Sequence, residues 1–215
     1  MVEMIVLKDR EEWLQHRNRI GGSDAAAIVG LNPYRSNVEL WQIKTGQMEQ
    51  EDISDKPYVK YGTEAEQHLR ELFKLDFPEY KVCYEENNMF LNDKYPFGHA
   101  SLDGWLVDAD GRKGVWECKT TNILQSMQKE KWKYRIPDNY YVQLLHYLLI
   151  TEFEFAVLKA QLKYDFDGEI FLQTQHYKIE RAEVQSDIDY LEAEERRFWR
   201  QVQERKTPDL KLPEI

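Results

Sequence analysis

The stretch that decides the fold reads GHASLDGWLVDADGRKGVWECK and spans residues 98–119. Apolar residues alternate loosely through Leu102, Trp105 and Val107, and the stretch ends on VWECK at residues 115–119. Residues 108–114 between these parts are rich in Asp and Gly, which favour turns. We therefore predict two strands joined by a turn.

Three charged side chains fall on this predicted strand pair. Because successive side chains of a strand point to opposite faces, Glu117 and Lys119 share one face, and Trp116 and Cys118 share the other. A hairpin brings Asp103 beside Glu117. Two carboxylates and an ammonium are costly to bury unless they bind a metal or a substrate. The alternative is a salt-bridged, solvated sheet face, where such a pair contributes ~0–1 kcal/mol.

The composition bounds the class of protein. A hydrophobic content of 42%, with 13% aromatic residues, is enough for a core and argues against disorder. The length of 215 residues predicts one domain over residues 1–215. Apolar runs stay short of the ~20 residues that span a bilayer, and the charged N-terminus is unlike a signal peptide. Cys83 and Cys118 form neither a disulfide framework nor a zinc pattern, so we expect a reducing cytoplasm.

The net charge of −10 disfavours a non-specific coat on nucleic acid, because such binding comes from phosphate neutralisation. It leaves room for a DNA enzyme, since metal-binding carboxylates add negative charge and a local basic strip can bind DNA. Residues 129–135, KEKWKYR, alternate cations with aromatic residues. This basic strip predicts either a DNA contact or the exposed flank of a helix or loop.

A glycine-rich turn lies near the N-terminus, in residues 17–30, RNRIGGSDAAAIVG. Ser23 is a suitable N-cap, and the alanine-rich residues after it predict a helix that ends at Gly30. Free N–H groups and the helix dipole make such a turn a ready anion site. Arg17 or Arg19 would add a bidentate clamp. The alternative is an ordinary capped helix.

Helical spacing of apolar residues predicts a helix over residues 58–76, with Leu69, Leu72 and Phe73 inward and Glu66 at the edge of the apolar stripe. A second helix, residues 139–150, carries Gln143 on a leucine-rich sequence. Further helices are predicted at 9–18, with Trp13 and Leu14 facing inward, after the capping box of residues 36–39, and at 180–205. Strands are predicted at 80–92, 95–107, 153–162 and 169–179.

Taken together, roughly residues 10–180 resemble the lambda exonuclease branch of the PD-(D/E)XK nuclease superfamily, also known as the YqaJ-like viral recombinase family. Four blocks carry the resemblance in order: WLQHR at 13–17 with IGGSDA at 20–25, GTEAE at 62–66 with Leu72-Phe73, SLDG at 101–104 with ECK at 117–119, and YYVQ at 140–143 through Thr151. The resemblance implies an α/β (α+β) fold with a restriction-endonuclease-like core, a central mixed sheet flanked by helices.

The resemblance also implies roles for individual residues. Asp103 and Glu117 look like metal ligands, together with the backbone carbonyl of Cys118 and with Glu66 through a water. Lys119 looks like the lysine that helps activate the attacking water. Two further sets follow from the same matches: Gln143 completes the catalytic site, and Arg17, Ser23 and Ser101 hold a 5′-phosphate, with Arg19 competing for the role of Arg17.

The implied activity is a 5′→3′ exonuclease on linear double-stranded DNA, with Mg²⁺ as cofactor and Mn²⁺ as substitute, because hard oxygen ligands favour these ions. The family context is phage-type recombination by single-strand annealing, with an annealing protein as partner and a ring trimer as assembly. An endonuclease with the same metal core is one alternative, although it has no need of a terminal-phosphate pocket. A non-catalytic protein that binds DNA ends is another.

Overall fold

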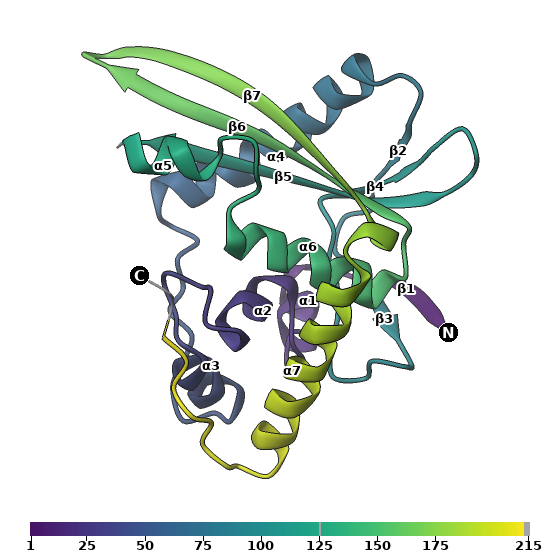
Figure 1. Ribbon diagram of the computed structural model, residues 1–215, viewed down its shortest axis with the longest axis vertical. Coiled ribbons are helices and arrows are strands. Elements are labelled where there is room, and N and C mark those ends of the chain that lie inside the picture. Colours follow the sequence, from purple (N-terminus) through teal and green to yellow (C-terminus); the bar gives the residue numbers. More distant parts are fainter. Residues whose placement is uncertain (125, 213–215) are drawn as a thin grey trace.

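The computed structural model describes residues 1–124 and 126–212, and its centre is a mixed five-stranded sheet covered by helices (Figure 1). β5 and β6 run parallel, and the other neighbours in this sheet are antiparallel. The predicted fold class is therefore confirmed. The strands of the sheet, in spatial order, are β2 (Lys81–Cys83), β4 (Gly104–Val107), β5 (Lys113–Ile123), β6 (Phe155–Phe166) and β7 (Glu169–Glu180). A separate antiparallel pair joins β1 (Val2–Val6) to β3 (Asn88–Asn92).

Two of the helices begin at start signals that can be read in the sequence. Ser36 and Glu39 form the predicted capping box at the start of α3, and Pro57 occupies the first turn of α4, where its missing N–H costs nothing. No helix formed by the described residues has the length and apolar character needed to cross a membrane. The helices are α1 (Arg10–His16), α2 (Gly22–Ile28), α3 (Asn37–Lys44), α4 (Pro57–Asp76), α5 (Ser126–Lys131), α6 (Asp138–Thr151), a 3₁₀ turn (Arg181–Glu183) and α7 (Gln185–Gln203).

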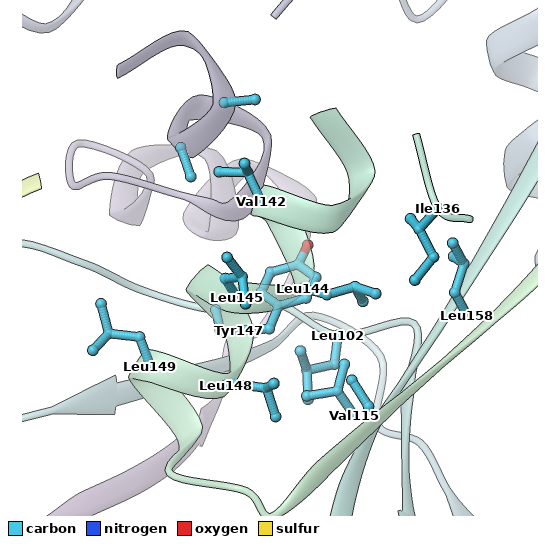
Figure 2. Packing of buried hydrophobic residues seen from close by; sticks show 14 of the residues in the cluster. Leu102, Val115, Ile136, Val142, Leu144, Leu145, Tyr147, Leu148, Leu149 and Leu158 are labelled. Carbon is cyan, nitrogen blue, oxygen red and sulfur yellow. The ribbon is translucent and has the colours of Figure 1, made fainter. Parts of the chain in front are cut away.

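The largest part of the core surrounds α6, where every residue from Val142 to Thr151 is buried. Leucines of this helix pack in one cluster with Leu102, Val115 and Leu158, which lie on its sheet side (Figure 2). Burial of a large apolar side chain contributes ~1.5–3 kcal/mol relative to exposure. α2 and α7 also pack on α6, so this helix is enclosed on several sides and supports the residues it carries.

The opposite face of the sheet is covered by α4. Leu69 and Phe73 of this helix pack on Trp116, Cys118 and Phe155. Val115 lies in the α6 cluster, whereas Trp116 and Cys118 lie in the α4 cluster. The predicted alternation of faces along β5 is thus present, and the strand separates two apolar layers.

Replacement of Leu148 by Ala is expected to lower the free energy of unfolding by about 2–5 kcal/mol, because the fully buried side chain leaves a cavity between α6 and the sheet. Leu75→Ala is a matched control, since that leucine is 77% exposed and its loss should change stability by less than about 0.5 kcal/mol. Urea denaturation followed by circular dichroism measures both. Equal shifts of the two midpoints would contradict the described core.

Several predicted boundaries are wrong. The strand expected over 95–107 is limited to Gly104–Val107, and earlier residues make only the isolated bridges Ile20↔Gly98 and Phe90↔Ala100 among the described residues. Pro96 removes a ladder donor in this segment. The strand expected over 80–92 splits into β2 and β3 around a turn in which Asn87 has a positive φ of 54°.

Two leucines expected to face inward are exposed instead. Leu14 is 52% exposed because α1 is a short surface helix without a buried residue. Leu72 is 49% exposed, since it sits one position, or about 100°, round the helix from the inward Phe73. Sequence reasoning also missed β1, which is too short and too exposed to show a clear alternation.

Candidate active site

The predicted acidic residues lie near the point where the pairing of β5 with β4 ends. Pairing between β4 and β5 stops at Gly104↔Trp116, so the part of β5 beyond Trp116 has an open edge on that side. Asp103 immediately precedes β4, and its Oδ2 accepts a hydrogen bond from the backbone N–H of Cys118 at 3.0 Å. This bond fixes the Asp103 carboxylate at the beginning of the open edge.

The Cys118 backbone shares this edge. In an extended strand the N–H and C=O of one residue point to the same side, so the Cys118 carbonyl points toward the edge that its N–H shares with Asp103. Its thiol lies in the apolar layer under α4, where burial, followed by the charge of Asp103, raises the pKa well above its usual value. Cys118 therefore reaches the site through its main chain alone.

Glu117, Lys119 and Gln143 form one hydrogen-bonded group on the α6 face. Glu117 is 2% exposed, and its Oε1 accepts from Lys119 Nζ at 2.5 Å and from Gln143 Nε2 at 2.8 Å. Among the described residues, Glu117 Oε2 is buried without a hydrogen-bond partner. A buried carboxylate oxygen that lacks a donor calls for a ligand, because leaving it unsatisfied costs about 1–3 kcal/mol.

The charges of this group also favour a bound ligand at Glu117. Burial, followed by repulsion from Asp103, raises the pKa of Glu117 to about 8. Burial works to lower the pKa of Lys119, but Glu117 and Asp103 hold it well above its usual value. The single positive charge of Lys119 thus does not neutralise the acidic side chains around it.

Glu66 approaches from the other side of the sheet, on α4. Burial, followed by repulsion from Asp103, raises its pKa to about 7, while Arg70 opposes the rise. Arg70 is buried, and its Nη1 donates to the Asp103 carbonyl at 2.7 Å and to Glu66 Oε1 at 3.4 Å. Sequence reasoning missed Arg70; its spacing of four residues from Glu66, on the same helix face, was the available signal.

The donors suit a hard divalent cation, because carboxylate and carbonyl oxygens are the ligands of Mg²⁺ and Mn²⁺. The partnerless Glu117 oxygen and the mutual repulsion of Glu66, Asp103 and Glu117 also fit such an ion. In residues 1–124 and 126–212, no three His, Cys, Asp or Glu side chains already converge as a metal cluster. The predicted ligand set is of a different kind, because it combines two side chains with a backbone carbonyl and a water-mediated Glu66.

The residues predicted to bind phosphate lie at the N-terminal turn. Trp13 Nε1 donates to Ser101 Oγ at 3.0 Å, and Arg17 Nη2 donates to Ser23 Oγ at 3.4 Å. The Arg17 guanidinium lies 4.6 Å from the centre of the Trp13 ring, and that of Arg10 lies 4.2 Å from it. Of the two arginines considered, Arg17 is the one that contacts Ser23. Sequence reasoning missed the roles of Arg10 and Trp13 in this group.

The N-cap of α2 is Gly21, so the prediction that Ser23 caps the helix is wrong. Asp24 takes the capping role instead, because its Oδ2 reaches the backbone N–H of Gly21 at 3.1 Å. The Ser23 side chain is exposed at the second helical position, where it contacts Arg17. The Ser23 hydroxyl therefore lies beside Arg17, in the group predicted to bind a phosphate.

Tyr147 connects the turn to the acidic group. A Cβ on Gly22 would lie 2.4 Å from Tyr147 Cε1, so only glycine fits against this ring. The hydroxyl of Tyr147 accepts a hydrogen bond from Gln143 Nε2 at 2.8 Å, and Gln143 donates to Glu117. The predicted phosphate group and the predicted metal group are therefore neighbours, joined through α6. Tyr147 was not predicted as a site residue, because it is one of three tyrosines in a leucine-rich helix.

The basic strip of residues 129–135 also lies close to the site. Its Trp132 is buried and stacks on Tyr140 with ring centres 5.4 Å apart, and the Tyr140 ring centre lies 5.5 Å from Lys119 Nζ. The cations of the strip are exposed. This arrangement is compatible with both interpretations of the strip, a DNA contact and an exposed flank.

Three of the solved structures with a similar fold are structures of exonucleases. An alkaline exonuclease (LHK-Exo) from Laribacter hongkongensis matches with a TM-score of 0.67 and 19% identity, covering 91% of this chain and 94% of that one. The complex of LHK-Exo with dAMP matches with a TM-score of 0.63. A phage related exonuclease from Haemophilus somnus 129PT matches with a TM-score of 0.57 and 15% identity, over 87% of this chain and 96% of that one. At these identities the matches establish the fold.

The sequence itself matches known relatives. The uncharacterized protein YqaJ of Bacillus subtilis (strain 168) is 36% identical over 141 residues, which are 65% of this chain and 41% of that protein. The chain thus spans about two fifths of the length of this curated relative. The sequence model of the YqaJ-like viral recombinase domain matches residues 12–154, which include all of the predicted site residues. The chain belongs to the YqaJ-like viral recombinase domain family.

Proposed function

We propose that this protein is a divalent-cation-dependent exonuclease that degrades linear double-stranded DNA from 5′-phosphorylated ends in the 5′→3′ direction. The observation that carries the proposal is the contact chain from Glu117 through Gln143 and Tyr147 to Gly22. This contact chain supports the proposal, because it links the residues proposed for phosphodiester hydrolysis to the turn proposed to bind a terminal phosphate. The exonucleases among the solved structures of similar fold support the same activity.

The proposed metal ligands are Asp103, Glu117 and the Cys118 carbonyl, with Glu66 acting through a water. When bound, Mg²⁺ or Mn²⁺ supplies Lewis-acid polarisation of the scissile phosphate. Lys119 then orients the attacking water and stabilises the negative charge that develops on the phosphate oxygens. Gln143 holds the Glu117 carboxylate in a fixed orientation, since it donates to both Glu117 and Tyr147.

The proposed phosphate pocket consists of Arg17, Ser23 and Ser101. A guanidinium and two hydroxyls offer several donors to one phosphate, and Arg binds phosphate in a bidentate manner. A terminal phosphate carries more negative charge than an internal diester, so such a pocket prefers ends. The complex of LHK-Exo with dAMP, a nucleotide with one phosphate, is in keeping with a phosphate-binding pocket in this fold.

Replacement of Arg17 by Ala is expected to reduce the preference for 5′-phosphorylated over 5′-hydroxyl duplex by roughly tenfold to a hundredfold, because a charge-assisted hydrogen bond is worth ~1.5–3 kcal/mol. Initial rates on linear duplexes that differ only in the 5′ group measure the preference. Arg19→Ala is the matched control, because Arg19 belongs to the same turn, while the Ser23 contact comes from Arg17. A loss of preference in the control alone would transfer the role to Arg19.

The wild-type protein tests the proposal directly. Linear duplexes labelled at either end, with and without a 5′-phosphate and with and without Mg²⁺, should show Mg²⁺-dependent loss of the 5′ label first. Covalently closed circular duplex should remain intact. Efficient cleavage of closed circles, independent of the 5′ group, would favour the endonuclease. Binding of ends without cleavage in Mg²⁺ or Mn²⁺ would favour a non-catalytic end-binding protein.

Other features of the proposal stay predictions. A single-strand annealing protein as partner and a ring trimer rest on the family, whereas a single domain over residues 1–215 and a cytoplasmic location rest on the chain length and the cysteine content. The expected biological role is phage-type recombination, in which the 5′→3′ degradation exposes a single strand for annealing.

A further inference from the structure

Lys44 is the last residue of α3, and its buried ammonium lies against the turn that carries Arg17 and Ser23. Its side chain is 8% exposed. Nζ lies 2.7 Å from Asp24 Oδ2, 2.6 Å from the Arg19 carbonyl and 3.4 Å from the Arg17 carbonyl. An ammonium has three donors, and here three acceptors are in reach of them. Lys44 is thus committed to the turn and has no donor left for DNA.

Asp24 completes the arrangement from the other end of the turn. It is 5% exposed, accepts from the Gly21 N–H, and has Arg35 Nη1 at 4.0 Å as a second cation. Burial works to raise its pKa, but Lys44 and the Gly21 N–H lower it below the usual value, so the carboxylate is ionised. One buried ion pair therefore ties the backbone at residues 17 and 19 to the start of α2.

We propose that Lys44 is a positioning residue for the 5′-phosphate pocket, which makes end recognition depend on a side chain that does not touch the substrate. The inference rests on the proposed function. Arg17 and Ser23 are six positions apart, and the turn between them is held from both sides by the Lys44–Asp24 pair. Without this anchor the backbone of Arg17 is released, and a displacement of about 1 Å is enough to cost up to ~10²-fold in a positioned contact.

Two variants test the inference. The double variant Asp24→Asn with Lys44→Met removes both charges, so that no uncompensated charge stays buried. Lys44→Arg keeps the charge opposite Asp24, but its planar fork does not reproduce three converging donors. The matched control is Lys159→Met, which removes another buried lysine; its partner Asp76 is 52% exposed, and the pair lies on the α4 face. Circular dichroism and thermal midpoints establish that each variant is folded.

The readouts are KM, kcat and the ratio of rates on 5′-phosphorylated and 5′-hydroxyl duplex, with Mg²⁺ held at saturation. For both Lys44 variants we expect a KM on phosphorylated duplex raised about tenfold or more, kcat within about twofold of wild type, and a ratio that falls about tenfold. The Lys159→Met variant should keep the wild-type ratio. A general structural role of Lys44 would instead lower kcat and leave the ratio unchanged.

The outcomes separate this inference from the proposed function. If wild type cleaves without regard to the 5′ group, the proposed function fails first. If wild type is selective and a folded Lys44 variant is equally selective, the function stands and the inference is overturned. A fall of the ratio in the Lys159 control by the same factor would also overturn it, because any buried lysine would then have the same effect.

Discussion

Replacement of Asp103 by Asn is expected to abolish Mg²⁺-dependent cleavage and to weaken Mg²⁺ binding, while the fold is retained. The side chains have the same shape, and the Asn carbonyl can still accept the hydrogen bond from the Cys118 N–H. The change removes one of two proposed carboxylate ligands. A cation contributes several kcal/mol to stabilising the charge of the transition state, so we expect a loss of at least ~10³-fold in turnover.

Calorimetric titration with Mg²⁺ and end-labelled duplex assays measure the two effects separately. Asp110→Asn is the matched control, because Asp110 is exposed in the turn between β4 and β5 and makes the same change of charge. Unchanged Mg²⁺ affinity in the Asp103 variant would remove Asp103 from the metal site. If binding persists and cleavage is lost, Asp103 acts on the substrate rather than on the ion.

The Lys119→Ala variant is expected to retain Mg²⁺ binding and to lose about 10²–10³ in turnover. A lysine repels cations, so its place beside the acidic residues makes sense in the reaction and not in metal binding. Removal of one preformed group that stabilises developing charge typically has this cost. Glu117 keeps its hydrogen bond from Gln143 in the variant, which helps to preserve its orientation.

Single-turnover rates at saturating Mg²⁺ isolate the chemical step in this variant from product release. Lys113→Ala is the control, since Lys113 is exposed at the beginning of the same strand. Near-normal turnover in Lys119→Ala would reduce the residue to an ion-pair partner of Glu117. Loss of Mg²⁺ affinity in the same variant would indicate that the lysine shapes the metal site itself.

The features that sequence reasoning predicted well are local in the chain. Alternation along β5 is a property of five consecutive residues, so the separation of Glu117 and Lys119 from Trp116 and Cys118 follows from the strand alone. The capping box at Ser36 is equally local. The fold class followed from the resemblance to a known family, and the blocks that carry it lie within the matched residues.

The features that were missed depend on contacts between distant segments. Arg70 matters because α4 brings it to the Asp103 carbonyl, which is 33 positions away. Tyr147 matters because its ring rests on Gly22. Lys44 looks like an ordinary basic residue in the last turn of a helix until α3 is packed against the N-terminal turn. The Ser23 cap was wrong for a local reason, because α2 begins at Gly22 with Gly21 as its N-cap, and Asp24 accepts the hydrogen bond from the Gly21 N–H.

The packing of Tyr147 on Gly22 has a consequence for the length of the products. Gly22 packs on Tyr147 and Glu117 is hydrogen-bonded to Gln143, so both the proposed end-binding group and the proposed cutting group contact α6, which is buried from Val142 to Thr151. Under the proposed function, this shared helix would set the distance between the bound terminal phosphate and the phosphodiester that is cleaved. The product length would then depend on the protein and be the same for every base sequence.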